Sequence, residues 1–384
     1  KNGKLSIYKN IIWKPEDIDS LASSLLNQHQ KEILRHRWSV DFARTICKTR
    51  LRINIFSTTR GLSLAVRFLP GRIPNIEDLN LHPSLKEMAQ FPSGLIIICG
   101  ATGSGKSTTI AALINEINQQ RPAHIITLED PIEYIFHLSN AFVEQRELGT
   151  HFPTFSRGLL DVLREMPDVI LVGELRESET IRLTLNAAES GHLVLASLHA
   201  SNPEEALYRI CNAFSLEAQE FVRFQLSSSL AGILVQKLQF RQELGFRVPL
   251  LSILRTTKGV KGAIRDNKIS QVYNIIEIAR HEGMFTFERY QREFLDEKKD
   301  FTSPIDSFKP SPKQEFEPSY HSKLIGNSTI SSLYTTINSS NLKDSVYKPN
   351  NINENEQNSL SNIIDADKIE DLIKEITNRG QKKS

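Results

Sequence analysis

The chain has 384 residues, 39% of them hydrophobic, and a formal net charge of only +2. This length supports two domains with cores of their own, and the near-neutral charge gives no strong field toward nucleic acid, so direct nucleic-acid binding is not expected. The longest apolar runs, such as Leu95–Cys99, are far too short to cross a bilayer, so any membrane association is expected to be peripheral.

A first unit is expected over residues 1–70. Pro15–Gln30 has helical character, and the runs LRINIF (51–56) and LSLAVRF (62–68) alternate apolar and polar residues as half-buried strands do. The stretch LPGRIPNIEDL then carries two prolines and a glycine, which predicts a linker over residues 71–78.

A second unit is expected over residues 79–297, where apolar strand-like runs alternate with amphipathic helical segments. This alternation predicts an α/β domain with a mostly parallel sheet covered by helices. Residues 298–384 are rich in Ser, Asn, Pro, Glu and Lys and are expected to be mostly disordered, because they cannot bury enough apolar surface to offset their ordering entropy. Within them, an apolar stripe predicts a short helix at 363–378, which either docks or forms transiently.

The run GATGSGKS fits the phosphate-binding pattern G-x-x-x-x-G-K-[ST] without a mismatch, between an apolar strand and a helical segment. Its glycines allow backbone N–H groups to close around phosphate oxygens at a helix N-terminus. Lys106 is expected to reach the β- and γ-phosphates of ATP, and the Ser107 hydroxyl is expected to ligate Mg²⁺. The predicted nucleotide-binding residues of this run are Gly100, Ala101, Thr102, Gly103, Ser104, Gly105, Lys106, Ser107 and Thr108.

Carboxylates follow two strand-like runs, at the strand ends where ligands of open α/β sheets bind. Glu174 follows the run VILV, whereas Asp168 precedes it and lies about 20 Å away along an extended strand. Glu174 is therefore predicted to hold Mg²⁺, directly or through water. The run HIITLEDPIEY ends in Glu129, Asp130 and Glu133, one of which is expected to orient or deprotonate the attacking water. The spacing does not separate them, although Glu129 is favoured over Glu133, and a solvated acidic loop is the alternative.

Two histidines flank the strand-like run in GHLVLASLHAS. They stand about 20 Å apart if this run is extended, so they cannot both contact one phosphate. His199, at the carboxyl end, is predicted to sense the γ-phosphate, and His192 is predicted to be structural or to lie between subunits.

These four elements, in this order, are similar to the Walker A loop, aspartate box, Walker B strand and histidine box of the secretion ATPase superfamily. Within it, residues 38–295 resemble the PilT-type ATPases that retract type IV pili and drive twitching motility. The resemblance is carried by SGLIIICGATGSGKSTTIAALINEIN, HIITLEDPIEY, EQRELGT and LREMPDVILVGELRESETIRLTLNAAESGHLVLASLHA, with RLRINIFSTTRGLSLAVRFLP upstream. It implies a RecA-like P-loop ATPase domain preceded by part of a PAS-like α+β domain.

The resemblance also implies a homo-hexameric ring that hydrolyses ATP in the cytoplasm, at the inner face of the inner membrane. ATP would lie between the two domains, with Arg52, Arg60 and Arg67 clamping its phosphates, since an arginine there neutralises developing charge. The alternative is that these are ordinary arginines of a strand surface. The implied partners are an inner-membrane pilus platform protein and a cognate assembly ATPase.

The cysteines favour the retraction branch. Assembly and type II secretion ATPases usually carry a four-cysteine zinc module, which the three isolated cysteines Cys47, Cys99 and Cys211 cannot build.

Other positions depart from the family. The family's AIRNLI stretch, tied to retraction, aligns with GVKGAI (259–264), in which Lys261 replaces the arginine and two glycines are expected to loosen the helix. Leu160 and Met166 replace a family arginine and a family acid. Pilus assembly, secretion, DNA uptake, or a degenerate nucleotide-binding regulator of a cognate motor therefore remain alternatives to retraction.

Overall fold

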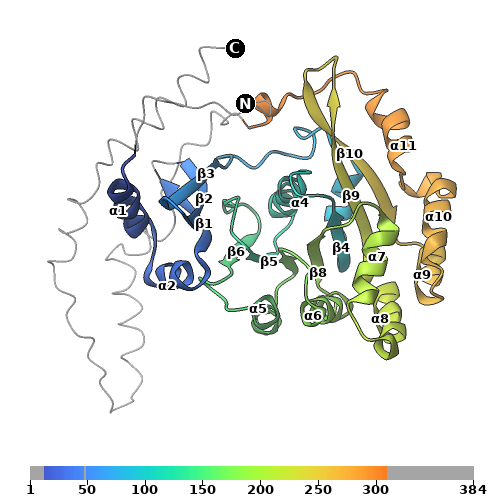
Figure 1. The fold of residues 1–384 in the computed structure, drawn as a ribbon. Helices are drawn as coiled ribbons and strands as arrows, with labels where there is room; N and C mark the ends of the chain where they lie inside the picture. Colours follow the sequence, from blue (N-terminus) through green and yellow to red (C-terminus); the bar gives the residue numbers. More distant parts are fainter. Residues whose placement is uncertain (1–12, 47–48, 309–384) are drawn as a thin grey trace, which may run out of the picture.

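The computed structural model describes residues 13–46 and 49–308, whose helices and strands are shown in Figure 1. The disorder expected of the chain beyond residue 308 and the helix expected at 363–378 lie outside the described residues, as does Cys47.

The N-terminal unit packs two helices on a small antiparallel sheet with the strand order β1-β2-β3. Alternate residues of β1 and β2 point into its core, including Val40, Phe42, Ile53 and Ile55, as the period of a strand requires. Its elements are α1 (Pro15–Leu25), α2 (Gln28–Arg37), β1 (Ser39–Ile46), β2 (Thr49–Thr58) and β3 (Gly61–Phe68). The two strands expected from LRINIF and LSLAVRF are present as β2 and β3.

The helical character expected over Pro15–Gln30 is present, but it is divided between α1 and α2, because Asn27 starts a second helix. Its side-chain oxygen accepts a hydrogen bond from the backbone N–H of Gln30 at 2.8 Å, and the Gln30 side chain accepts one from the backbone N–H of Asn27 at 3.0 Å. This reciprocal pair satisfies N–H groups that a helix start leaves free. Strand β1 was not expected, although Val40 and Phe42 alternate with polar neighbours.

The larger unit is built on a mostly parallel sheet, as predicted. In the described part of the chain this sheet has seven strands in the order β10-β9-β4-β8-β7-β5-β6, and only β9 and β10 pair antiparallel. The strands are β4 (Gly94–Cys99), β5 (His124–Glu129), β6 (Phe142–Glu147), β7 (Val169–Val172), β8 (Leu193–Leu198), β9 (Leu230–Arg241) and β10 (Phe246–Arg255).

Helices cover both faces of this sheet. They are α3 (Ser84–Ala89), α4 (Lys106–Gln120), α5 (Phe155–Val162), α6 (Ser178–Glu189), α7 (Pro203–Asn212), α8 (Leu216–Ser229), α9 (Lys258–Arg265), α10 (Val272–Ile278), α11 (Phe287–Tyr290) and α12 (Pro304–Ser307), with 3₁₀ turns at Ile269–Gln271 and Arg280–Glu282 and a π-helical turn at Gln291–Leu295. The stretch expected to be loosened by two glycines is the continuous helix α9, capped by Thr257 and anchored by the buried Val260 and Ile264.

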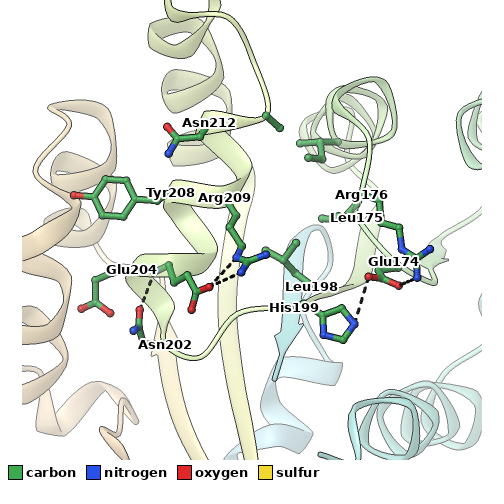
Figure 2. Close-up of a pocket in the computed structure, with 13 residues that line it drawn as sticks. Glu174, Leu175, Arg176, Leu198, His199, Asn202, Glu204, Tyr208, Arg209 and Asn212 are labelled. Carbon is green, nitrogen blue, oxygen red and sulfur yellow. Dashed lines mark hydrogen bonds and ion pairs between the residues drawn. The ribbon is translucent and has the colours of Figure 1, made fainter. Parts of the chain in front are cut away.

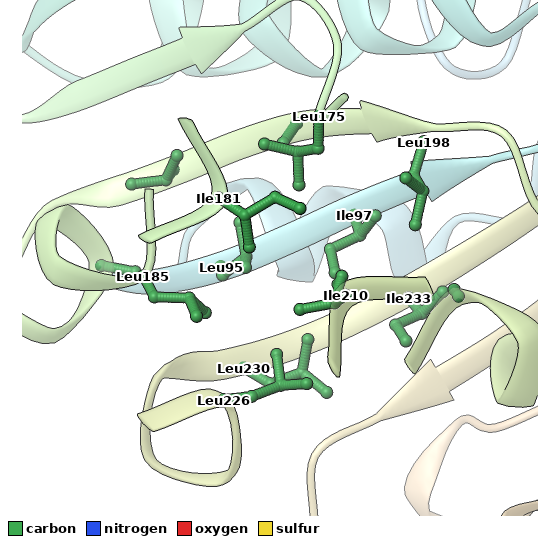
Figure 3. Packing of buried hydrophobic residues seen from close by; sticks show 14 of the residues in the cluster. Leu95, Ile97, Leu175, Ile181, Leu185, Leu198, Ile210, Leu226, Leu230 and Ile233 are labelled. Carbon is green, nitrogen blue, oxygen red and sulfur yellow. The ribbon is translucent and has the colours of Figure 1, made fainter. Parts of the chain in front are cut away.

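Strand β4 supplies side chains to two cores. Leu95 and Ile97 pack with residues of α6, α7 and α8 on one face, as Figure 3 shows, whereas Ile96 and Ile98 pack with α3 and α4 on the other. Burying each such side chain contributes about 1.5–3 kcal/mol. All six residues of β4 are buried, so the loop that follows it starts from a firmly held strand end.

Hydrogen bonds continue past the boundary expected at residue 297. The side chain of Asn80 donates to the backbone oxygen of Thr302 at 2.8 Å and accepts from its N–H at 2.9 Å. The hydroxyl of Ser307 donates to the backbone oxygen of Asp78 at 2.6 Å. Residues 302–307 are therefore joined to the segment that connects the two units.

Candidate nucleotide site

The glycine-rich loop connects β4 to α4 at the carboxyl edge of the sheet. Gly100, Gly103 and Gly105 have φ values of 144°, 77° and 90°, in the range that favours glycine. A Cβ on Gly100 would lie 2.4 Å from the backbone oxygen of Gln236 on the neighbouring strand β9. Helix α4 starts at Lys106, directly after the loop. Backbone N–H groups at a helix start are thereby exposed at the strand edge, an arrangement that binds anions.

A cavity of ≈ 430 Å³ lies against this loop, between the two units, within the size range of about 300–1,000 Å³ typical of small-molecule sites. Most of the predicted site residues line it: Arg52, Arg67, Thr102, Gly103, Gly105, Lys106, Ser107, Thr108, Glu129, Glu133, Glu174 and His199. Gly100, Ala101, Ser104 and Arg60 are not part of its wall.

Lys106 lies over the loop. Its ammonium donates to the backbone oxygens of Gly100 and Ala101 at 2.7 and 3.0 Å. Burial lowers the pKa of Lys106, and the carboxylate of Glu174 opposes this shift. A negatively charged group in the cavity would oppose it in the same way, so the position of Lys106 suits a phosphate.

Glu174 and His199 are brought together from the ends of neighbouring strands β7 and β8. The Oε1 atom of Glu174 lies 3.5 Å from Nε2 of His199, and its Oε2 atom accepts a hydrogen bond of 2.6 Å from Arg176 (Figure 2). The carboxyl edge of the sheet thus places a carboxylate, an imidazole and a guanidinium beside the glycine-rich loop.

Asp168 and His192 lie at the opposite edge of the sheet. The carboxylate of Asp168 accepts a hydrogen bond of 2.7 Å from the N–H of His124, and Nδ1 of His192 lies 2.7 Å from the backbone oxygen of Pro167. Both side chains therefore tie strand starts together, far from the glycine-rich loop.

A larger cavity of ≈ 830 Å³ lies on the other side of Glu174 and His199, against helix α7 (Figure 2). It shares Glu174, Arg176 and His199 with the cavity at the glycine-rich loop. Its remaining polar wall comes from α7 and the preceding turn, with Glu205 paired to Arg209 at 2.7 Å. It carries neither the loop nor Lys106, so the smaller cavity is the candidate phosphate site.

Glu129 is held by neighbours in its own sheet. Its Oε1 atom accepts hydrogen bonds from the hydroxyl of Thr127 at 2.7 Å and from the side chain of Gln145 at 3.0 Å. Burial raises the pKa of Glu129 to about 7, although these two hydrogen bonds oppose the shift. Gln145 also donates to the backbone oxygen of Tyr134 at 2.8 Å, so it fixes both the carboxyl and the loop beside it.

Side chains of β2 bridge the two units. Arg52 contacts Glu133 at 2.8 Å and Asp41 at 2.6 Å, and the hydrogen bond to Asp41 raises the pKa of Arg52 above its ordinary value. Two residues earlier, Arg50 donates to the backbone oxygen of Ile132 at 2.8 Å. The arginines of one strand face therefore fasten the N-terminal unit to the loop that follows β5.

The three predicted arginines do not occupy equivalent places. Arg52 and Arg67 are direct cross-strand partners on β2 and β3, and both line the cavity. Arg60 lies exposed in the turn between these strands. The geometry thus brings two of the three arginines to the candidate phosphate site.

Three residues of the site were not singled out from the sequence. Tyr134, whose hydroxyl lies 2.8 Å from that of Thr108, ends the run HIITLEDPIEY and was within reach of a motif-based argument. Arg176 was also near a quoted carboxylate. Gln236 gave no sequence signal, because its contact with the loop depends on β9 pairing with β4.

Comparisons with known proteins agree with this geometry. A family model described as type II/IV secretion system protein matches residues 38–257. The uncharacterized protein YggR of Escherichia coli K12 is 44% identical over 71% of this chain and 84% of its own length. The type IV pilus retraction ATPase PilT of Pseudomonas aeruginosa is 35% identical over 71% of this chain and 79% of its own. A crystal structure of the pilus retraction motor PilT with bound ADP superposes with a TM-score of 0.64 at 39% identity, covering 71% of this chain and 82% of that chain.

The matched residues include the end of the N-terminal unit, the glycine-rich loop and the strands that carry Glu129, Glu174 and His199. Among residues 13–46 and 49–308, no helix combines the length and apolar character that crossing a membrane requires. The resemblance inferred from the four motifs is confirmed, and the chain belongs to the family of type II/IV secretion system proteins.

Proposed function

We propose that this protein is an ATP-hydrolysing motor of the PilT class, which drives the retraction of type IV pili. The observation that carries the proposal is the cavity in which the glycine-rich loop of the larger unit faces Arg52 and Arg67 of the N-terminal unit. A nucleotide bound there contacts both units and stabilises their closed arrangement, so each hydrolysis and release shifts a conformational population. The named relatives support retraction as the load.

The chain's own residues suit the binding of a nucleotide with Mg²⁺. The N–H groups of the loop and Lys106 bind phosphate oxygens, and Arg52 and Arg67 neutralise charge from the opposite side. The described residues hold no group of three or more His, Cys, Asp and Glu side chains that would make a metal site by itself. Mg²⁺ is usually held by one or two protein ligands together with substrate phosphates, and Ser107 and Glu174 would supply these ligands here.

Glu129 is the proposed general base. Its carboxyl is oriented by Thr127 and Gln145, and its pKa of about 7 suits proton transfer near neutral pH. Glu133 instead contacts Arg52, which assigns it to the joint between the units. His199, beside Glu174, is the proposed sensor of the γ-phosphate.

The assembly proposed from family resemblance is a homo-hexamer at the cytoplasmic face of the inner membrane. It would act on a pilus platform protein embedded in that membrane, alongside a cognate assembly ATPase. Each subunit would supply a complete cavity, because both of its walls come from one chain.

Phosphate release by the purified protein tests the chemistry. Lys106→Ala and Glu174→Gln are expected to abolish hydrolysis, whereas Glu179→Gln, an exposed carboxyl paired only with Arg182 in the described contacts, is expected to retain it. Tight ATP binding without any turnover would instead indicate a nucleotide-binding regulator.

Counting surface pili in cells that lack the gene tests the load. Excess pili that cannot shorten are the expected result. Bald cells would indicate pilus assembly, and unchanged pili would indicate secretion or DNA transfer.

A further inference from the structure

The side chain of Gln236 lies beneath the glycine-rich loop. It comes from β9 at the position after Val235, which pairs with the last residue of β4, and only 2% of its surface is exposed. A Cβ on Gly105 would stand 2.7 Å from its Nε2 atom. Gln236 therefore packs directly against the loop from the side opposite the cavity.

Both ends of the Gln236 amide are hydrogen-bonded. Its Nε2 atom donates to the backbone oxygen of Ser104 at 2.8 Å, and its Oε1 atom accepts from the hydroxyl of Thr109 at 2.7 Å. A hydroxyl can donate to Oε1 and a carbonyl can only accept from Nε2, so the two partners also fix which way the amide faces. The bridge spans the loop and the first turn of α4.

The bond to Ser104 sets the direction of a neighbouring N–H. In a trans peptide the carbonyl and the following N–H point in opposite directions. Because the Ser104 carbonyl points down to Gln236, the N–H of Gly105 points up, toward the cavity side of the loop. Without the amide donor, this peptide plane would be free to rotate about the flexible glycine.

We propose that Gln236 is a positioning residue for nucleotide binding, which orients the Gly105 N–H toward a phosphate by holding the Ser104 carbonyl. The residue is not part of the cavity wall and acts through the loop. The inference rests on the proposed nucleotide site, but it is independent of the load that the protein moves.

Three variants of the full chain test it, with ADP as the probe in calorimetric titrations and ATP in turnover assays. Gln236→Leu removes both hydrogen bonds. Gln236→Glu keeps the shape but replaces the amide donor by a carboxylate, which cannot donate to the Ser104 carbonyl at pH 8. Gln225→Leu is the matched control: Gln225 is 6% exposed, and in the described contacts its side chain bonds only Asn186 and Glu189, away from the loop.

Both Gln236 variants are expected to raise the Kd for ADP and the KM for ATP about tenfold together, the loss of one phosphate hydrogen bond, with kcat changed less than about threefold. Gln225→Leu is expected to lower the melting temperature about as much as the Gln236 variants do, but to leave the Kd for ADP unchanged. A Gln236→Glu protein that binds ADP as tightly as wild type would overturn the proposal, as would a Gln236→Leu protein that loses only stability. Failure of the wild-type protein to bind ADP would refute the proposed nucleotide site instead.

Discussion

Burial raises the pKa of Glu129 to about 7, because the buried site disfavours the charged carboxylate. A general base must be deprotonated to act. The rate of ATP hydrolysis at saturating ATP is therefore expected to fall severalfold as the pH is lowered from 8 to 6, with an apparent pKa near 7. A rate profile that stays flat across this range would remove Glu129 from the role of base.

The same carboxyl affects stability. Its folded pKa lies above the ordinary 4.5, so the stability that it supports is complete at low pH and is lost as the pH rises through about 7. Gln at this position stays neutral and can still accept from Thr127 and Gln145. Glu129→Gln is thus expected to inactivate the protein while stabilising it by roughly 1–3 kcal/mol at pH 8, with little gain at pH 5.

Urea unfolding at the two pH values measures this difference. Glu179→Gln is the control. This carboxyl is exposed, so its replacement by an amide removes no buried charge. An equal gain at both pH values would contradict the explanation by charge burial.

The residue scale also shows what the sequence could not resolve. Glu174 and His199 were predicted separately from strand ends and lie 3.5 Å apart, because β7 and β8 are neighbours. The choice between Glu129 and Glu133 needed the contacts of each, which spacing does not contain. Gln236 could not be predicted at all, since its two partners are more than a hundred residues away in sequence.

Helix α9 contains glycines whose cost to the stability of the protein can be measured. A Cβ added at Gly262 would meet no atom within 4 Å, and a helical glycine costs about 0.5–1 kcal/mol relative to alanine. Gly262→Ala is therefore expected to raise the free energy of unfolding by that amount, about 1–4 °C in melting temperature. ATP turnover by the same variant would show whether a stiffer α9 changes the activity of the motor.

The control for this prediction is Gly232→Ala in β9. A Cβ there would stand 2.5 Å from the Cε of Met88 and 2.9 Å from the backbone oxygen of Leu254. This variant is expected to be less stable than the wild type, as measured by calorimetry. A loss of stability in Gly262→Ala as well would mean that α9 does not have the open surface described.

At the scale of elements, apolar runs predicted the core strands closely, because each strand is buried on both faces and its sequence is an uninterrupted run of mostly apolar residues. Helix breaks were harder. The division between α1 and α2 depends on the capping role of Asn27, which overrides a sequence that is otherwise compatible with one helix.

At the scale of the molecule, Arg52 joins the two units and faces the nucleotide cavity. Arg52→Ala removes the ion pair with Glu133 and one positive charge from the cavity wall, so the KM for ATP is expected to rise about tenfold or more. Steady-state kinetics measure this change. Arg44→Ala, whose side chain bonds only backbone oxygens of α1 in the described contacts, is expected to leave the KM unchanged. If both variants bind ATP equally well, Arg52 has no part in the site.

The order of units and the class of fold followed from the alternation of elements and from the four motifs, because each is local in sequence. The joint between the units did not. It depends on side chains such as Arg50 that donate to backbone oxygens of the other unit, and such contacts give no pattern in the amino-acid sequence.

The hydrogen bonds around the connecting segment limit how far the two units can travel. The N–H of Leu69 bonds the oxygen of Arg50 at 2.9 Å on one side. On the other side Ile76 is buried in the core of the larger unit and Glu77 pairs with Lys86, so residues 70–75 connect the two anchored ends. At about 3.5 Å per residue, this connection reaches at most about 21 Å. The N-terminal unit can therefore swing and tilt over the glycine-rich loop, but it cannot exchange places with the same unit of a remote subunit while these bonds hold.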